Sequence, residues 1–213
     1  MFIESRPALL QALSERLLRD LPPALWSEVH AASREGAVHF ERRALTLVHA
    51  ELEPARAQRW RDEAAAEIEW VAACQQGVVE RAGHGGYRMR FMSPRSALRG
   101  ALLLQRIAPE AALRIGVCGG ECELANFFAG GRSWSFAIGD IARRAAATAQ
   151  SAVPGTIAIA AESCAALGGL LEEEVGSGLL SLEFDGDAVA QATVTLAPRP
   201  NADLSSFAGL GLL

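Results

Sequence analysis

Two cysteines in this sequence have a spacing that a metal site could use. Cys118 and Cys122 are separated by Gly-Gly-Glu, and zinc sites often contain paired cysteines a few positions apart. No second pair of cysteines or histidines follows them, so we expect buried or hairpin thiols rather than a metal site. With Cys74 and Cys164, the four cysteines are too few and too irregularly spaced for a disulfide framework. We therefore predict a reduced, cytoplasmic protein.

The basic and nucleophilic residues exclude several other chemistries. All 20 basic residues are arginine, and a chain without lysine cannot form Schiff bases or bind phosphate through a P-loop lysine. Ser133, Ser163 and Cys164 have no histidine–acid pattern near them, so nucleophilic catalysis gains no support. The net charge of −5 argues against nucleic-acid binding, which usually depends on a basic patch.

The elements that position these residues begin with a helical extension over residues 1–40. Leucines recur there at helical spacing, and Pro22-Pro23 ends the helix. The stripe consists of Leu9, Leu10, Leu13, Leu17, Leu18 and Leu21. Charged residues interrupt residues 1–22, so no signal peptide is predicted, and no apolar run approaches the roughly 18 residues of a membrane-spanning helix. A second short helix is expected over 24–33, and the pair either covers the main domain or docks on a partner.

Residues 41–198 alternate strands and helices. Strands are predicted at 44–49, 77–81, 87–91, 113–117, 121–128, 156–160, 179–184 and 188–196, with 113–117 and 121–128 forming a hairpin. Helices are predicted at 54–76, after Ser93-Pro94, at 138–151 and at 162–167. This βαββαβ order with an extra C-terminal hairpin is typical of a ferredoxin-like α+β fold, with a mostly antiparallel sheet and its helices on one face. Residues 199–213 form an apolar tail.

Several short motifs at consistent spacing resemble the catalytic domain of class III adenylate and guanylate cyclases. The first is Leu113-Arg-Ile-Gly-Val-Cys-Gly-Gly-Glu121, followed by Ile138-Gly139-Asp140 and Pro154-Gly155-Thr156-Ile157. Gly77-Val-Val and Phe91-Met-Ser-Pro-Arg-Ser-Ala-Leu98 precede them at the spacing of the family. The resemblance covers residues 44 to 197 and implies a nucleotide-cyclase-like fold.

The resemblance also implies where the chemistry would lie. In that family two aspartates hold two divalent metals, a lysine and an aspartate read the purine, an asparagine positions the ribose, and an arginine stabilises the transition state. The metal residues and the others come from different protomers of a head-to-tail dimer. The corresponding positions here are Glu51 and Gly85 for the metals, Arg81 and Trp134 for the purine, Arg143 for the ribose and Ala147 for the transition state.

All six positions differ from the residues of the family. Gly85 offers no metal ligand, whereas Glu51 could still coordinate a metal, although its extra methylene shifts the carboxylate. A His84–Glu51 pair, with His49 two residues before Glu51, supplies fewer ligands than the three or four that zinc needs. Neither half of the catalytic set survives, so the chain could not complement an active partner. We therefore predict that it is not an enzyme, with no catalytic metal and no cofactor.

Arginines could still let the active-site cleft implied by the resemblance bind a ligand, because guanidinium groups form paired hydrogen bonds with phosphates. The candidates for binding a nucleotide or phosphorylated ligand are Arg81, Arg143 and Arg144. Arg88 and Arg90 could join them, or could instead form a charged sheet face with Glu80 or Glu183. A ligand sensor needs Arg81 and Arg143 in one concave pocket, whereas a binding module would have these arginines in ion pairs or in solvent.

The sequence favours a catalytically inactive cyclase-homology protein that acts through protein–protein interaction in bacterial signalling or cellular organisation. The alternative is a sensor that binds a ligand in the degenerate cleft. The expected partner is another protein, in a homodimer or heterodimer, without nucleic acid or membrane insertion. The candidate partner-binding residues are Leu9, Leu10, Leu13, Leu17, Leu21, Phe127, Phe128 and Trp134, and the C-terminal tail is expected to pack on its own domain.

Overall fold

The computed structural model describes residues 20–21, 23–27, 29, 38–52, 65–81, 86–107, 111–129, 131–164, 167, 169–170, 180–184 and 192–196. Within them the strands are β1 (Val38–Glu51), β2 (Val78–Arg81), β3 (Tyr87–Phe91), β4 (Arg114–Ala129), β5 (Arg132–Ile138), β6 (Ile157–Ile159), β7 (Leu180–Phe184) and β8 (Ala192–Leu196). The labelled helices are α4 (Pro94–Ile107), α5 (Asp140–Ser151) and the short 3-10 helix η1 (Pro23–Leu25). A further helix covers residues 65–74.

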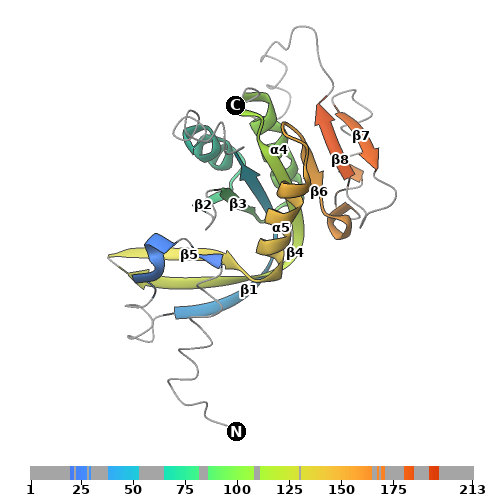
Figure 1. Cartoon of the computed structure of the whole chain (residues 1–213). Coiled ribbons are helices and arrows are strands. Elements are labelled where there is room, and N and C mark those ends of the chain that lie inside the picture. Colours follow the sequence, from blue (N-terminus) through green and yellow to red (C-terminus); the bar gives the residue numbers. More distant parts are fainter. Residues whose placement is uncertain are drawn as a thin grey trace.

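The described strands form one sheet in the order β2-β3-β1-β4-β6-β8-β7, and β5 pairs with β4 (Figure 1). β1 is antiparallel to both β3 and β4, whereas β4 and β6 are parallel. β8 is antiparallel to β6 and to β7. The mixed α+β architecture and the closing hairpin of β7 and β8 confirm the predicted fold class.

One prediction about the middle of the chain was wrong. Residues 113–117 and 121–128 do not form a hairpin, because β4 runs without a break from Arg114 to Ala129. Gly119 and Gly120 pair with Thr46 and Leu45 of β1, so they lie inside the strand. The turn follows at Gly131, whose φ of 76° suits glycine. The strand after this turn, β5, was not predicted, and it pairs with β4 over 123–129.

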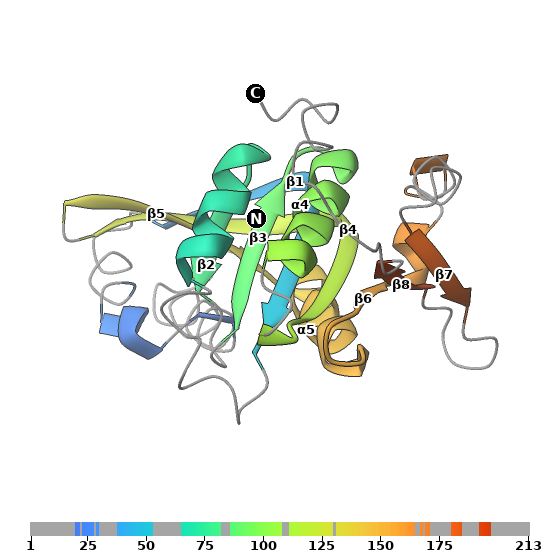
Figure 2. The same cartoon turned by 90° about the horizontal axis from the view of Figure 1, so that it is seen from above.

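The helices cover both faces of the sheet rather than one. Val48 and Ala50 of β1 pack with α4 and with the helix over 65–74, whereas Leu45 and Leu47 pack with α5. Adjacent residues of a strand point to opposite faces, so the apolar run in β1 needs cover on both sides. Figure 2 shows α4 and α5 on either side of β1 and β4.

The first half of β1, the second half of β4 and all of β5 extend away from the rest of the sheet (Figure 1). We name this three-stranded unit, residues 38–44, 121–129 and 132–138, the arm. One face of the arm carries aromatic residues that form a separate core with Leu21 and Val29 of the N-terminal extension. The extension therefore covers the main domain at least over these residues.

The remaining predictions have mixed outcomes. Helices α4 and α5 and strands β2, β3, β6, β7 and β8 lie close to the predicted bounds. Of the helix predicted over 54–76, residues 65–74 are confirmed and residues 53–64 lie outside the described residues, as does the tail after residue 196. Among the described helices, none is long and apolar enough to cross a membrane.

Candidate functional site

Of the two positions that the resemblance assigns to metals, the structure describes one, Glu51. Glu51 ends β1, and its Oε2 atom is buried without a hydrogen-bond partner. Gly85 and His84 lie outside the described residues, and glycine has no side chain to bind a metal. His49 packs closely on Gly86, because a Cβ there would lie 2.6 Å from the His49 Nε2. Nowhere in the described ranges do three His, Cys, Asp or Glu side chains come together as metal ligands. Glu51 is therefore the one carboxylate at these two positions, whereas a two-metal centre in this family uses two.

The candidate arginines of α5 are held by carboxylates of this chain. Arg143 lies 3.5 Å from the Asp20 Oδ2 and also pairs with Asp140. Arg144 lies 2.5 Å from the Glu162 Oε1. Both side chains are about half exposed, at 52% and 49%. Ala147, at the transition-state position, is exposed and has no charge. Arg81 lies in β2, but its side chain is outside the described part of the structure.

Arg88 and Arg90 of β3 share the carboxylate of Glu80, as the charged-face hypothesis predicts. The Glu80 oxygens lie 3.6 Å from the Arg88 Nε and 3.3 Å from the Arg90 Nη1. Both oxygens accept hydrogen bonds from the Ala137 N–H of β5, at 3.1 and 3.0 Å. Arg88 also donates to the Ala137 carbonyl at 2.7 Å. These contacts with the backbone of Ala137 join β2 and β3 to the arm.

Burial changes the titration of this network and of the nearby thiols. Desolvation raises the pKa of Glu80, although Arg88, Arg90 and the Ala137 N–H all lower it. Desolvation also raises the pKa of Cys118 and of Cys122 to about 11. Both cysteines are buried on the α5 side of the sheet, which confirms the buried thiols expected from the sequence. Buried thiols with such a pKa are poor nucleophiles, because the thiolate is the reactive form.

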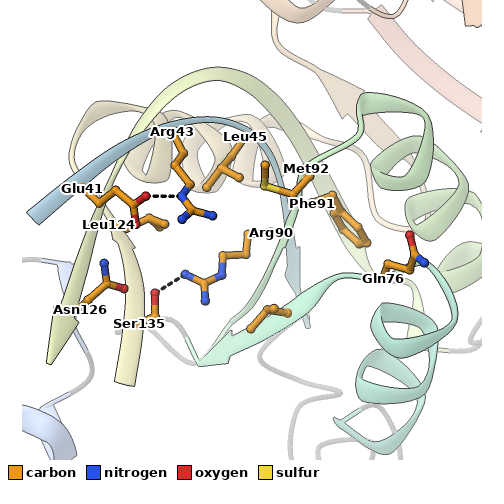
Figure 3. Close-up of a pocket in the computed structure, with 11 residues that line it drawn as sticks. Glu41, Arg43, Leu45, Gln76, Arg90, Phe91, Met92, Leu124, Asn126 and Ser135 are labelled. Atoms are coloured by element: carbon orange, nitrogen blue, oxygen red, sulfur yellow. Dashed lines mark hydrogen bonds and ion pairs between the residues drawn. The ribbon is translucent and has the colours of Figure 1, made fainter. Parts of the chain in front are cut away.

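A pocket of about 260 Å³ lies between the arm and the start of β2. Figure 3 shows that Arg43 from β1 and Arg90 from β3 both line this pocket. Arg43 donates a hydrogen bond to Glu41, and Arg90 donates one to the Ser135 hydroxyl. The other lining residues are Leu45, Gln76, Val78, Phe91, Met92, Leu124 and Asn126. Glu51, Trp134, Arg143 and Ala147, the mapped positions whose side chains the structure describes, do not line this pocket, and neither does Arg144.

The candidate partner surface is only partly accessible. Phe127, Trp134 and Phe136 stack with ring centroids 5.9–6.4 Å apart. Phe127 and Leu21 were predicted as partner-binding residues, but they are 4% and 2% exposed because they pack together in the core of the arm. Trp134 packs against the same core and is partly exposed, whereas Phe128 is 57% exposed. Leu9, Leu10, Leu13 and Leu17 lie outside the described residues.

Sequence reasoning missed Asp20, whose side chain is only 4% exposed. Its Oδ2 atom accepts a hydrogen bond from the Gly139 N–H at 2.8 Å, across 119 positions of sequence. Asp20 was one of several charges on a predicted amphipathic helix, and nothing in the local pattern distinguishes it. The contacts of the adjacent Leu21 were not predictable either, because the spacing of the leucines does not show which surface of the domain they cover.

At the level of sequence, no protein-family model matches the chain, and no curated protein matches it. In structure it is similar to the adenylyl cyclase CyaB from P. aeruginosa, with 15% identity, a TM-score of 0.56, and coverage of 78% of this chain and 100% of the other. The dimeric guanylyl cyclase domain of the RhoGC fusion protein from Blastocladiella emersonii matches with 12% identity and a TM-score of 0.56, over 76% and 99%. An adenylate cyclase from Trypanosoma brucei in its monomeric state matches with 14% identity and a TM-score of 0.57, over 75% and 91%.

These similarities agree with the sequence motifs and with the order of the elements. At such low identity they concern the fold and not the activity. The chain has the fold of a class III nucleotide cyclase catalytic domain.

Proposed function

We propose that this chain is a catalytically inactive cyclase-homology protein that acts through protein–protein contact, in bacterial signalling or cellular organisation. The proposal rests first on the six mapped positions, none of which has the residue expected for catalysis. Two of them, Gly85 and Ala147, carry no group that could bind a metal or stabilise charge. Metal ions and preorganised positive charge supply most of the catalysis in phosphoryl chemistry.

The observation that carries the proposal is the pairing of Arg143 and Arg144. Both guanidiniums are bound to carboxylates of this chain, namely Asp20, Asp140 and Glu162. A phosphorylated ligand would have to displace these carboxylates before it could use either arginine. This arrangement favours the interaction protein over the sensor.

The first experiment is an activity assay with ATP or GTP and with Mn²⁺ or Mg²⁺. We expect no cyclic nucleotide above a blank, under conditions in which an active cyclase added to the same mixture gives product. Gly85→Asp alone should stay inactive, because it restores one metal ligand but neither the purine-reading groups nor the transition-state arginine. Metal-dependent turnover by the unmodified protein would contradict the proposal.

The sensor alternative is supported by one observation, the pocket that Arg43 and Arg90 line. A ligand that binds the folded state raises its melting temperature by mass action. A thermal-shift series with ATP, GTP and their cyclic products therefore separates the two functions. Saturable stabilisation by one nucleotide, lost in Arg43→Ala but kept in Arg144→Ala, would favour the sensor over the interaction protein.

A further inference from the structure

The carboxylate of Asp20 lies at a corner, at the start of α5, where two N–H donors of other residues converge. The corner consists of the Gly139 N–H, which donates to the Asp20 Oδ2 at 2.8 Å, and the Arg143 Nη1, 3.5 Å from the same oxygen. The backbone of Asp20 is held as well, because the Arg88 Nη2 lies 3.5 Å from its carbonyl oxygen. A buried carboxylate is costly unless it is paired and hydrogen-bonded, and here its partners are Arg143 of α5 and the N–H of Gly139, the residue before that helix.

The start of α5 needs a group that its own sequence does not supply. Gly139 is the N-cap residue and has no side chain to cap the helix. In a capping box, a glutamate or glutamine three residues after the N-cap accepts a bond from the N-cap N–H, but that position here is Ala142. Asp20 accepts this bond instead, and a negative charge is favourable at the N-terminus of a helix.

The contact at Asp20 places the next residues on the aromatic face of the arm. Leu21 and Val29 are 2% and 7% exposed and pack with Phe127 and Phe136, and Leu25 packs against the same group. The Trp26 Nε1 donates a hydrogen bond to the Leu21 carbonyl at 3.3 Å, which links the Trp26 side chain to the backbone five residues before it. A group of polar contacts at Asp20 and an apolar contact through Leu21, Leu25 and Val29 therefore hold the extension on the domain.

We propose that Asp20 is the intramolecular ligand of an anion-binding corner at the start of α5, and that it holds residues 20–29 as a latch over the aromatic face of the arm. Loss of the Asp20 carboxylate from this corner removes the side-chain polar contacts that hold the latch. Release of the latch uncovers Phe127 and Phe136. The latch involves the same Arg143–Asp20 pair that supports the proposed function, but it requires neither a partner protein nor catalysis, so its test can fail or succeed separately.

The test uses the full chain and reads the amide exchange of Gly139 together with the binding of a dye for exposed apolar surface. In Asp20→Ala we expect the Gly139 amide to exchange about tenfold faster or more, because its acceptor is lost. Dye binding should rise, with faster exchange confined to residues 20–29 and the arm. Arg144→Gln is the matched control, since Arg144 lies on the same helix with similar exposure but pairs with Glu162.

Inorganic sulfate is the probe for the corner itself. In Asp20→Ala, tens of millimolar sulfate should slow the exchange of Gly139 compared with chloride at equal ionic strength, and adding Arg143→Gln should remove this effect. Sulfate should leave the exchange of Gly139 in the unmodified protein unchanged. The proposal is overturned if Gly139 exchange is unchanged in Asp20→Ala, if the faster exchange spreads over the whole sheet, or if sulfate has no effect in the variant.

Discussion

Glu80 is the residue on which the contact between the arm and the β2–β3 hairpin depends. Its side chain is 1% exposed and lies near the guanidiniums of Arg88 and Arg90 and the Ala137 N–H. Two opposing effects act on its charge. Burial penalises the carboxylate, whereas the two arginines and the hydrogen bond stabilise it, and the net result is a raised pKa.

This direction predicts how stability depends on pH. A carboxyl group whose pKa is higher in the folded state binds more protons folded than unfolded, between the ordinary value of 4.5 and the raised value. The contribution of Glu80 to the free energy of unfolding is therefore largest below 4.5 and falls as the pH rises through that window. Glu80→Gln resembles the protonated form and does not titrate, so it is the reference.

We expect the free energy of unfolding of the unmodified protein, relative to that of Glu80→Gln, to fall as the pH rises from below 4.5 and to level off above the folded pKa. Denaturant titrations of both proteins at a series of pH values measure this difference. A difference that rises with pH instead would mean that Arg88 and Arg90 outweigh the cost of burial.

At the scale of elements, the contact between β4 and α5 has no room for a side chain. A Cβ on Gly116 would lie 2.3 Å from the Ala149 nitrogen and 2.4 Å from the Ala145 oxygen, which are both backbone atoms of α5. Gly116→Ala must therefore move the helix, and overpacking of this kind costs about 1–3 kcal/mol or more. Chemical denaturation measures the loss. Gly169→Ala is the control, because a Cβ there meets no heavy atom within 4 Å; equal losses in both variants would contradict the close approach.

The strands and helices that the sequence predicts correctly are those marked by a pattern within a few residues, such as alternation or a glycine-rich turn. Alternation in Tyr87, Met89 and Phe91 predicts β3, and the glycine-rich turn before it predicts its pairing with β2. The two Gly-Gly pairs of the β4–β5 region look alike in sequence, but only the second ends a strand. Gly119 and Gly120 stay in β4 because β1 pairs with them across the sheet, and such a partner far along the chain is invisible to a local pattern.

The candidate site was predictable to a smaller extent. The identities of the six mapped positions follow directly from the motifs, and the pairing of Arg88 and Arg90 with Glu80 was one of two open alternatives. The pairing of Arg143 with Asp20 was not predictable, because it joins the extension to a helix more than 100 positions away. Long-range ion pairs depend on how the elements pack, which spacing along the chain does not specify.

At the scale of the whole molecule, the arm has one covered face and one open face. Leu21 and Val29 cover the face that carries Phe127, and Phe128 must point to the opposite face because adjacent strand residues alternate. Asn126 and Ser135 are on that open face and line the pocket, together with Val78 and Met92 of the β2–β3 region. Val78 and Met92, which line the pocket, are 47% and 66% exposed. Phe128 is 57% exposed and follows Asn126 by two residues on the same face of β4.

An exposed apolar group beside a hollow is typical of a contact surface. One structural relative is dimeric and another monomeric, so the fold permits either state. We expect this chain to form a dimer, with itself or with another protein, through the open face of the arm. Sedimentation at tens of micromolar should then give twice the mass of the 22.6 kDa chain if the dimer is a homodimer.

Phe128→Asp should convert that homodimer to a monomer, because a charge is costly where a partner covers it. The fold of the single chain should be kept, because Phe128 is 57% exposed in it. Val153→Asp is the matched control, since Val153 is 63% exposed after α5 and away from the arm. If both variants keep the dimer, the open face is not the contact. If the unmodified chain sediments as a monomer, the homodimer is excluded and only a heterodimer with a different protein remains.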